Sequence, residues 1–553
     1  MEAMIAMQKW WETAIGYQIY PKSFMDSNGD GIGDLQGIID KLDYLEDLGI
    51  TLVWICPIFK SPQVDHGYDV SDYTEIEEMY GSKEVLKTLV DEAYKRNIRV
   101  ILDLVVNHTS NQHHWFQEAL KDPNGKYGKY YIFEKGTKEA PPNNWTGIFN
   151  GSTWEKVGGA ESDLYYLHIF TTEQPDLNWE NYEMRQEIYK IINDWLDFGV
   201  AGFRVDAISH IKKNFDYEMK TSDRSDGMYF ALEHFNNCEG IEELLQEMKR
   251  ESFAKHDCFT VGEVNSPTIE QLDLYAGKNG HFNSVFDFSH TLDGVERKEF
   301  IDDQASYIEF MKEKVFNVQK NISTHTTMAN IIENHDLCRA IDRNIPKKYR
   351  NFHSSAMMGT INFFMRGIPF IYQGQEIGMR NYLKKSIEEF KDPTTLRQYE
   401  ELVALGQTPE EALAFVNLTS REHSRTPMQW NGKKNAGFTE GEPWFSVNPN
   451  YKKINVEAQL ADKNSLLQYY KDMILLRKRY EYPFVYGRFI PIFEEVKGII
   501  AYKREDITIL NNCTSKKVKL DIHIPMVLLS NYDDVETEGD SVVLQPFQSV
   551  VFL

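Results

Sequence analysis

The feature that most constrains the fold of this chain is a regular alternation of two kinds of segment. Short apolar or β-branched runs recur eight times, and most are followed by a stretch with helical periodicity. Alternating β and α segments favour a parallel sheet, and eight right-handed units close it into a barrel. The sequence therefore predicts an α/β fold, a (β/α)8 TIM barrel. The eight runs are Ile15–Tyr20, Leu52–Cys56, Val100–Val106, Gly202–Val205, Cys258–Glu263, Ser284–Phe288, Ala329–Ile332 and Pro369–Tyr372.

The stretches expected to form crossover helices lie between these runs. In each of them apolar residues recur at i, i+3, i+4 and i+7, which places them on one face of a helix that can pack against the barrel. The helical stretches are Leu35–Leu48, Lys83–Asn97, Arg185–Phe198, Ile241–Ser252, Ser306–Asn321 and Phe352–Phe364.

Two insertions interrupt the alternation, so that the barrel is expected to span residues 1–108 and 180–482. Between its third and fourth strands, residues 109–179 are rich in Gly, Asn, Tyr and Trp with little helical period, which predicts a loop-rich inserted subdomain. A second insertion, about 380–462, follows the eighth strand and carries a helix candidate at Pro409–Phe415. Long insertions at the carboxyl ends of barrel strands build the substrate pocket.

The pattern changes at the end of the chain, where residues 483–553 contain short strands without helical stretches between them. This pattern predicts a small C-terminal antiparallel β domain. The candidate strands are Ile499–Lys503, Ile507–Asn511, Val518–Ile522 and Val542–Leu544.

The charge of the chain bears on its partners. Lys and Arg number 60 against 84 Asp and Glu, a net charge of −24, which argues against nucleic acid or an anionic membrane as partner, because both require clustered positive charge. No apolar run approaches the ~18 residues that span a bilayer, and Met1–Lys9 lacks the features of a secretory signal. The five cysteines are scattered without CxxC spacing, as expected for reduced thiols. We expect a cytoplasmic protein.

Polar residues stand at the ends of several apolar runs. Asn107 and His108 follow the third run, Asp206 and Glu263 end the fourth and fifth, and Asn334-His335-Asp336 follows the seventh. A charge inside a barrel strand is costly unless it is paired or lies at the solvent-open end. Each residue taken alone could cap a helix. Their coincidence at four strand ends predicts instead that they converge in the mouth of the barrel.

Three carboxylates, one arginine and two histidines, without metal-ligand spacing, fit chemistry at an acetal carbon. One carboxylate attacks or stabilises an oxocarbenium-like centre, and a second, with a raised pKa, protonates the leaving oxygen. Arg204 lies two residues before Asp206 on the same strand, so both face the same side, and Arg204 is expected to keep Asp206 ionised. This pairing marks Asp206 as the nucleophile and Glu263 as the acid/base.

These residues resemble the signature regions of glycoside hydrolase family 13, the α-amylase family. The resemblance runs from Trp10 to about Trp430. The stretch Gln174–Asn178 is similar to an extra region that marks the oligo-1,6-glucosidase and α-glucosidase branch. The segments that resemble the family are Asp103–His108, Gly202–Asp206, Gly262–Glu263, Asn334–Asp336, Gly16–Phe24, Asp65–Asp69 and Ser424–Trp430.

The resemblance implies a retaining, exo-acting α-glucosidase with three catalytic carboxylates. Asp206 would be the nucleophile and Glu263 the general acid/base, while Asp336 would hold the sugar hydroxyls. Phe149 and Gln174, from the first insertion, are further candidates for the pocket wall. For Tyr68 and Phe149 the alternative interpretation is ordinary packing. The residues that the resemblance places around the −1 glucose are Asp65, Tyr68, His108, Arg204, His335 and Arg421.

A second candidate site is the loop 26–34, whose oxygen-bearing residues follow the spacing of an EF-hand. Position 12 of that pattern is Gly37 in place of the bidentate Glu, so the motif is incomplete. The pattern predicts a hard divalent cation, and the resemblance implies a structural Ca²⁺, with Mg²⁺ as an alternative. A loop closed by Asx turns without metal is the other interpretation. The expected ligands are Asp26, Asn28, Asp30, Ile32 through its carbonyl, and Asp34.

The linkage that is cut is predicted from two residues. In the resembling branch the residue after the nucleophile is often Val in 1,6-specific members and smaller or polar in 1,4-specific ones. Here it is Ala207, and Asn265 also resembles the α-1,4 members. We therefore expect hydrolysis of maltose and short malto-oligosaccharides, with transglucosylation as a further outcome. The alternatives are an oligo-1,6-glucosidase, a trehalose-6-phosphate hydrolase and a sucrose isomerase.

A non-enzymatic role is the remaining alternative, because barrels of this family also serve as ectodomains of transporter heavy chains. Such a chain should carry a transmembrane segment and lose catalytic carboxylates, and this sequence shows neither feature. The expected partner is a small oligosaccharide substrate. The sequence leaves monomer and dimer equally open.

Overall fold

The computed structural model describes residues 9–149, 151–224, 226–291 and 304–553. Eight parallel strands form a closed barrel, hydrogen-bonded in the order β1-β15-β14-β13-β12-β10-β5-β2. The predicted barrel is confirmed, and each strand coincides to within two residues with the apolar run that predicted it. The strands are β1 (Gly16–Ile19), β2 (Leu52–Ile55), β5 (Arg99–Val105), β10 (Gly202–Asp206), β12 (Phe259–Val264), β13 (Ser284–Asp287), β14 (Met328–Asn330) and β15 (Ile368–Tyr372).

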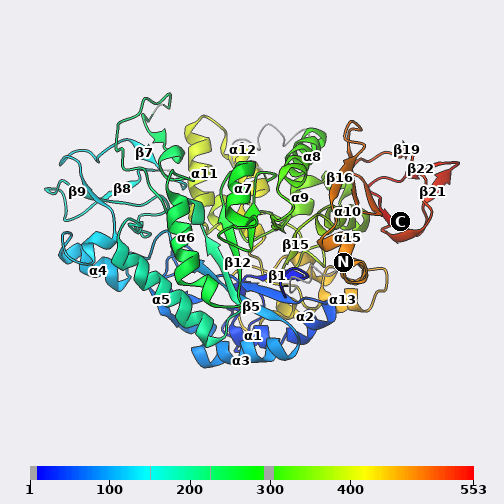
Figure 1. Ribbon diagram of the computed structural model, residues 1–553, viewed down its shortest axis with the longest axis horizontal. Coiled ribbons are helices and arrows are strands. Elements are labelled where there is room, and N and C mark those ends of the chain that lie inside the picture. The colour runs from blue at the N-terminus through cyan, green and yellow to red at the C-terminus, as the bar shows by residue number, and fades with distance from the viewer. Residues whose placement is uncertain (1–8, 150, 225, 292–303) are drawn as a thin grey trace. The chain divides into compact units, whose positions relative to one another are not determined.

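The crossover helices begin and end where local signals place them. Helix α5 (Tyr182–Phe198) begins after Asn181, whose side chain accepts a backbone N–H of the first turn, and ends at Gly199 with a φ of 116°. It lies beside α6 (Ile241–Glu251) (Figure 1). The other helices that match predicted stretches are α3 (Lys83–Lys95), α8 (Gln304–Asn321) and α10 (Phe352–Phe363).

The first predicted helix is broken in two. Helix α1 (Leu35–Ile39) and helix α2 (Leu42–Leu48) occupy the stretch that periodicity alone assigns to one helix. Asp40 stands at the break, and its carboxylate accepts a hydrogen bond from the Gln36 side chain at 2.9 Å. Aspartate is a poor residue for a helix interior, because its short side chain bonds to nearby groups in non-helical conformations.

The first insertion contains more regular structure than predicted. Helix α4 (His114–Lys121) begins after His113, whose ring nitrogen accepts the Trp115 N–H at 3.1 Å. A helix of this length is too short to give a clear period in a loop-rich sequence. The insertion also holds a three-stranded antiparallel sheet made of β6 (Phe133–Lys135), β9 (Leu164–Leu167) and β8 (Trp154–Lys156).

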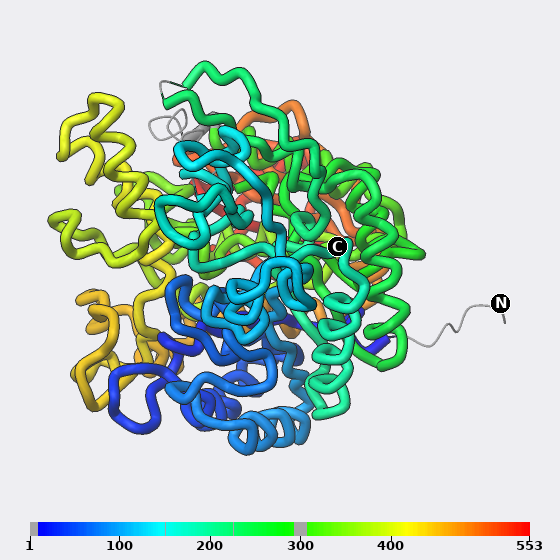
Figure 2. Tube along the Cα trace, turned by 90° about the vertical axis from the view of Figure 1, so that its left-hand side faces the viewer, coloured from blue at the N-terminus to red at the C-terminus, as the bar shows by residue number. Residues whose placement is uncertain are grey.

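The second insertion is built around a pair of helices. The predicted helix is α12 (Pro409–Thr419), and α11 (Pro393–Ala404), which the sequence analysis missed, packs against it. Both helices are drawn in yellow in Figure 2. Their shared core consists of Phe390, Leu402, Ala412, Phe415 and Val416. Of the missed helix, Thr395 and Leu402 are buried.

The C-terminal part of the chain forms antiparallel sheets, as predicted. A five-stranded sheet has the order β16-β17-β18-β23-β20, and a three-stranded sheet has the order β19-β22-β21. Four of these strands had no counterpart in the sequence analysis, because they are short or lie at sheet edges. The strands are β16 (Phe489–Ile492), β17 (Ile499–Arg504), β18 (Ile507–Asn512), β19 (Val518–Leu520), β20 (Val527–Ser530), β21 (Glu536–Glu538), β22 (Ser541–Leu544) and β23 (Ser549–Phe552).

Internal contacts divide the chain into two compact units. One contains Met1–Val53, Glu92–Ile98 and Phe286–Leu553, and the other contains Trp54–Asp91 and Arg99–Val285.

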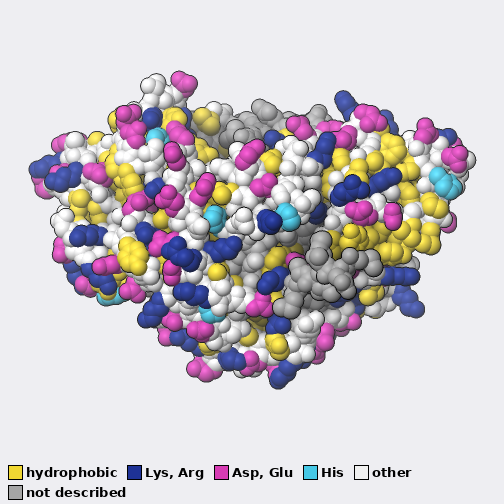
Figure 3. Space-filling model, in the orientation of Figure 1, with side chains coloured by type: hydrophobic (Ala, Val, Ile, Leu, Met, Phe, Trp, Pro, Cys, Tyr) yellow, Lys and Arg dark blue, Asp and Glu magenta, His cyan; other side chains and the backbone are white. Residues whose placement is uncertain are grey.

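All five cysteines are buried and free, as expected. Among the described residues, no helix is long and apolar enough to cross a membrane. Basic and acidic side chains are interspersed over the face shown in Figure 3.

The start of the nucleophile strand gives a prediction for stability. Gly202 has a φ of 144°, and a Cβ at this position would lie 1.8 Å from the carbonyl oxygen of Phe259 on the neighbouring strand. We expect Gly202→Ala to lower the free energy of unfolding by about 3 kcal/mol, because backbone must move to relieve the clash. Chemical denaturation measures this. The control is Gly432→Ala, where the nearest atom is 4.0 Å away; equal stability of the two variants would contradict the account.

Candidate active site

A single buried arginine gathers three carboxylates at the ends of neighbouring strands. Arg204 on β10 is in backbone register with Asp103 on β5 and with Val261 on β12, two residues before Glu263. Its Nη1 lies 2.8 Å from Asp103 and 2.5 Å from Asp206, and its Nη2 lies 2.7 Å from Glu263. The side chain of Arg204 is only 1% exposed. Strand alternation and register therefore place the predicted nucleophile and acid/base on one guanidinium.

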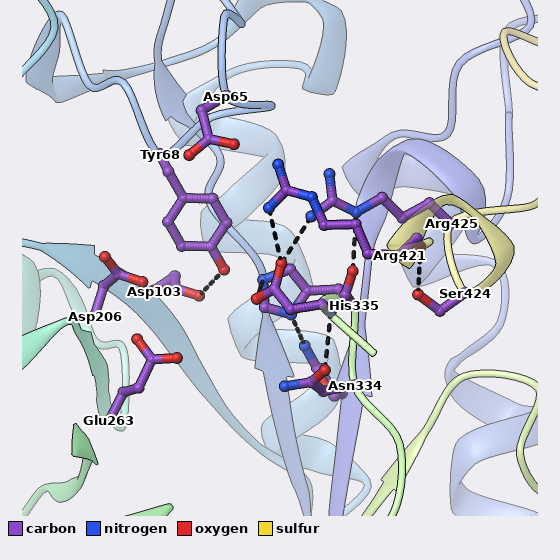
Figure 4. A network of polar contacts seen from close by, with 12 residues as sticks. Asp65, Tyr68, Asp103, Asp206, Glu263, Asn334, His335, Arg421, Ser424 and Arg425 are labelled. Atoms are coloured by element: carbon purple, nitrogen blue, oxygen red, sulfur yellow. Dashed lines mark hydrogen bonds and ion pairs between the residues drawn. The ribbon is translucent and has the colours of Figure 1, made fainter. Parts of the chain in front are cut away.

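The remaining donors around this cluster come from backbone and aromatic groups. The second oxygen of Glu263 accepts the N–H of Ala207 at 2.8 Å, and Ala207 has a left-handed φ of 45°. The second oxygen of Asp103 accepts bonds from the Trp54 indole at 3.1 Å and from the Tyr68 hydroxyl at 3.0 Å. Figure 4 shows Tyr68 directed at Asp103, with Asp206 and Glu263 nearby. The resemblance did not assign Asp103 a role, although it lies in a matching segment.

The electrostatics of Asp206 differ from the expectation. Burial raises the pKa of Asp206 well above its usual range, and the neighbouring charges of Glu263 and Asp103 add to this, while Arg204 opposes it. The sequence analysis considered only the attraction of Arg204. One guanidinium cannot neutralise three carboxylates, so Asp206 favours its protonated form more than an exposed carboxyl group does. Ionisation of Asp206 is therefore the pH-sensitive property of this site.

The first insertion contributes the neighbouring polar wall. Gln174 donates from Nε2 to Asp65 at 3.2 Å and lies 3.1 Å from Nε2 of His108. All three side chains are buried. Phe149, a predicted pocket-wall residue, packs edge-on against Phe170, with 5.3 Å between the ring centres. The ring centre of Phe170 lies 4.9 Å from that of His108. The structure thus groups Asp65, His108 and Gln174 directly and places Phe149 behind an intervening ring.

The third predicted carboxylate, Asp336, is held by three cationic or polar side chains. Its Oδ1 accepts hydrogen bonds from Arg425 at 2.9 Å and Arg421 at 3.1 Å, and its Oδ2 lies 2.9 Å from His335 Nε2. Burial alone would raise the pKa of Asp336, but His335, Arg425 and Arg421 lower it well below the usual range. Asp336 is therefore a fixed anion that accepts hydrogen bonds. Figure 4 shows His335, Arg421 and Arg425 close to one another.

A residue that the sequence analysis missed completes this arrangement. Asp392, 1% exposed and at the start of α11, accepts hydrogen bonds from Arg421 at 2.8 and 2.9 Å. Its other oxygen accepts the N–H and hydroxyl of Thr395 at 3.0 and 2.9 Å. Arg421 and Arg425 lower the pKa of Asp392 to about 2 despite its burial. No motif marks Asp392, because its role depends on how the second insertion folds back onto Arg421.

In the predicted cation loop, the carboxylate and amide oxygens of the expected ligands already accept hydrogen bonds. The Asp26 carboxylate accepts the backbone N–H groups of Asn28, Gly29 and Gly31 at 2.7–3.0 Å, together with the Thr439 hydroxyl. Asn28 and Asp30 each accept one backbone bond, and Asp34 caps α1. The oxygen-rich donor set suits a hard cation. Within the described ranges, however, no group of three His, Cys, Asp or Glu side chains could hold a metal.

Comparisons with known proteins agree with this chemistry. The family model described as "Alpha amylase, catalytic domain" matches residues 18–487. An oligo-1,6-glucosidase of Parageobacillus thermoglucosidasius is 41% identical over 98% of this chain and 98% of its own length. Nearly the whole length of this chain is thus similar to a protein named as an oligo-1,6-glucosidase.

Solved structures of two further kinds share the fold. The trehalose-6-phosphate hydrolase of Bacillus licheniformis superposes with a TM-score of 0.89 at 36% identity, covering 99% of both chains. The isomaltulose synthase of Klebsiella sp. LX3 superposes with a TM-score of 0.90 at 35% identity, again covering 99% of both. The same fold therefore occurs in proteins with different named activities.

The crowding of carboxylates gives a prediction for pH dependence. Asp103 raises the pKa of Asp206, so Asp103→Asn should lower that pKa. The substitution also removes one of the three carboxylates that share Arg204 and keeps Asp206 and Glu263. If Asp206 is the nucleophile, activity is lost as pH falls through its pKa. The acid limb of kcat/KM should then move to lower pH, even if the maximum rate falls.

A pH profile of initial rates tests this prediction. The control variant is Asp91→Asn, an exposed carboxylate on α3 whose partner is Lys87. An acid limb that stays in place or moves upward in Asp103→Asn would contradict the electrostatic account.

Proposed function

The chain belongs to the α-amylase family and is a glycoside hydrolase of the α-glucosidase type, and we propose that it is a retaining, exo-acting oligo-1,6-glucosidase. The observation that carries the proposal is the pairing of Asp206 and Glu263 with adjacent nitrogens of Arg204. Retaining enzymes hold their two carboxyl groups about 5–5.5 Å apart, and inverting enzymes about 6.5–9.5 Å apart. A shared guanidinium favours the closer spacing.

The proposed mechanism uses each carboxyl group in one role. Glu263 protonates the glycosidic oxygen while ionised Asp206 attacks the anomeric carbon, forming a β-linked glucosyl-enzyme and releasing the leaving alcohol. Glu263, now a carboxylate, takes a proton from water, which attacks the same carbon and displaces Asp206. The second inversion restores the α configuration. Arg204 offsets the negative charge that moves between the two carboxylates.

Asp336 is proposed to hold the glucose hydroxyls. A carboxylate whose pKa is held low by Arg421, Arg425 and His335 stays an acceptor at every pH at which the enzyme would work. Hydrogen bonds to sugar hydroxyls that strengthen in the transition state lower the barrier. His335 is aligned for this by Gln18, which lies 2.8 Å from its Nδ1.

The linkage preference rests on opposing observations. The similarity to an oligo-1,6-glucosidase over 98% of the chain favours cleavage of α-1,6 bonds. The α-1,6 linkage therefore replaces the α-1,4 linkage as the leading proposal. A specific observation keeps α-1,4 as the second candidate. Ala207 follows the nucleophile at a position where 1,6-specific members of the resembling branch often carry Val, and its small side chain leaves more room beside the scissile bond.

A panel of α-linked substrates tests the linkage proposal. We expect isomaltose to be hydrolysed with a higher kcat/KM than maltose, because binding energy at the leaving sugar distinguishes the two in the transition state. A clear preference for maltose would favour the second candidate. Trehalose 6-phosphate and sucrose belong in the same panel, with product analysis. Dominant hydrolysis of the former, or isomerisation of the latter, would contradict the proposal.

The two catalytic roles are separable by azide rescue. With an aryl α-glucoside that needs no acid, Glu263→Ala should still form the glucosyl-enzyme, and azide should attack it to give α-glucosyl azide. Asp206→Ala should lose activity by at least about 10³-fold, and azide entering from the vacated side should give β-glucosyl azide. NMR of the azide products measures the configurations. The opposite pairing of variants and products would reverse the assigned roles, and unchanged activity in either variant would refute them.

We also propose that the loop 26–34 binds Ca²⁺ through Asp26, Asn28, Asp30, the Ile32 carbonyl and Asp34. A cation that binds only the folded state raises stability in proportion to ln(1 + [Ca²⁺]/Kd), and 100 Kd contributes about 2.7 kcal/mol. We expect Tm to fall when chelator replaces excess Ca²⁺ and to respond less in Asp30→Asn. Equal Tm values with Ca²⁺ and chelator would favour the loop closed by Asx turns alone.

A further inference from the structure

The residue that follows strand β12 is held by side chains from another part of the barrel. Strand β12 ends at Val264, and the backbone groups of Asn265 bond to side chains in place of a neighbouring strand. The Asn265 N–H donates to the Ser209 hydroxyl at 3.2 Å. The Asn265 carbonyl accepts the side-chain amides of Asn236 at 3.2 Å and Asn237 at 3.1 Å. Both backbone polar groups of this residue are thus satisfied.

The amide of Asn237 has a single orientation that satisfies its neighbours. A carbonyl oxygen can only accept a hydrogen bond, so the atom of Asn237 that faces Asn265 must be the nitrogen. The amide oxygen then faces the hydroxyl of Tyr275, which donates to it at 2.9 Å. Tyr275 lies on α7 (Ile269–Ala276) and is completely buried. The backbone N–H of Asn237 donates to the Ser209 carbonyl at 2.8 Å, so this residue joins three separate segments of the chain.

These contacts connect the segments that carry the two proposed catalytic groups. Ser209 lies three residues after Asp206, and Asn265 lies two residues after Glu263. The two segments also meet at the acid/base itself, because Oε2 of Glu263 accepts the Ala207 N–H at 2.8 Å. The ends of β10 and β12 are therefore joined at the Glu263 carboxyl group and again beyond it. Bonds at two points limit how far one strand end can move relative to the other.

We propose that Asn237 is a positioning residue: it holds the backbone of Asn265 so that Glu263 stays within reach of the glycosidic oxygen that it protonates. The inference rests on the proposed function, because it takes Glu263 to be the general acid. Removal of the Asn237 amide leaves the Asn265 carbonyl with one side-chain donor in place of two, and the end of β12 gains freedom. A displacement of about 1 Å lowers the rate of a catalysed reaction by up to roughly 10²-fold.

Aryl α-glucosides whose phenols differ in acidity separate a positioning role from a structural one. A strongly acidic phenol leaves without a proton from Glu263, whereas a weakly acidic phenol needs that proton. The value of kcat/KM reports the step in which the bond to the phenol breaks. In Asn237→Ala, kcat/KM should stay near the wild-type value for a dinitrophenyl α-glucoside and fall roughly 10- to 100-fold for the phenyl α-glucoside.

A second variant tests the same chain of contacts from its far end. Tyr275→Phe removes only the hydroxyl that holds the Asn237 amide, so it should give a smaller loss with the same dependence on the phenol. The double variant should be no worse than Asn237→Ala, because both substitutions act through one amide.

The matched control is Asn193→Ala. The Asn193 amide also holds a backbone carbonyl, that of Glu251 at 3.0 Å, but it lies on helix α5. This variant should lower Tm and keep the wild-type dependence of kcat/KM on the phenol.

Each outcome decides. A loss of equal size for every phenol in Asn237→Ala would overturn the proposal, as would unchanged kcat/KM throughout the series. The same dependence in Asn193→Ala would also overturn it, because lost stability alone would then produce the effect. If Asn237→Ala does not fold, a uniform loss or no loss in Tyr275→Phe overturns the proposal. Failure of the proposed function is distinguishable, because the wild-type protein would then hydrolyse none of the aryl α-glucosides.

Discussion

The site depends on one buried guanidinium and on the imbalance of charge around it. Arg204 is nearly inaccessible to solvent and is shared by Asp103, Asp206 and Glu263. A buried cation requires such partners, and three buried carboxylates require more positive charge than one arginine supplies. Burial and the charges of Glu263 and Asp103 therefore raise the pKa of Asp206, and Arg204 opposes them. The proposed mechanism needs Asp206 ionised while Glu263 donates a proton, so the positive charge of Arg204 favours the form of Asp206 that attacks.

The third carboxylate has the opposite environment. Asp336 lies among Arg421, Arg425 and His335, and Asp392 holds Arg421 from its far side. His335, Arg425 and Arg421 lower the pKa of Asp336 and bond to both of its oxygens, so its charge is fixed and its orientation is set. The length of the second insertion has a physical reason in this arrangement, since it supplies both Arg421 and the buried aspartate that orients it. The carboxyl groups that change charge in the proposed reaction, Asp206 and Glu263, are thus different from Asp336, whose charge is fixed.

The sequence predicted those parts of the molecule that follow from local period and strand polarity. All eight barrel strands and the group around Asp206 and Glu263 fall into this class, because alternation along a strand determines which residues share a face. The expectation that Arg204 keeps Asp206 ionised left out burial and the charges of Glu263 and Asp103, which raise its pKa. Asp392 was missed because only the folded second insertion brings Arg421 to it. The linkage also remains a proposal, because Ala207 and the similar proteins favour different bonds.

The central claim is that two carboxyl groups on one guanidinium act by double displacement, so that the released glucose keeps the configuration of the substrate. The most direct measurement is ¹H NMR of the anomeric signals during the first minutes of hydrolysis, before mutarotation equilibrates the product. The account predicts that α-glucose forms first and that the β signal grows only later. Initial release of β-glucose would show a single displacement by water and would contradict the assignment of Asp206 as nucleophile.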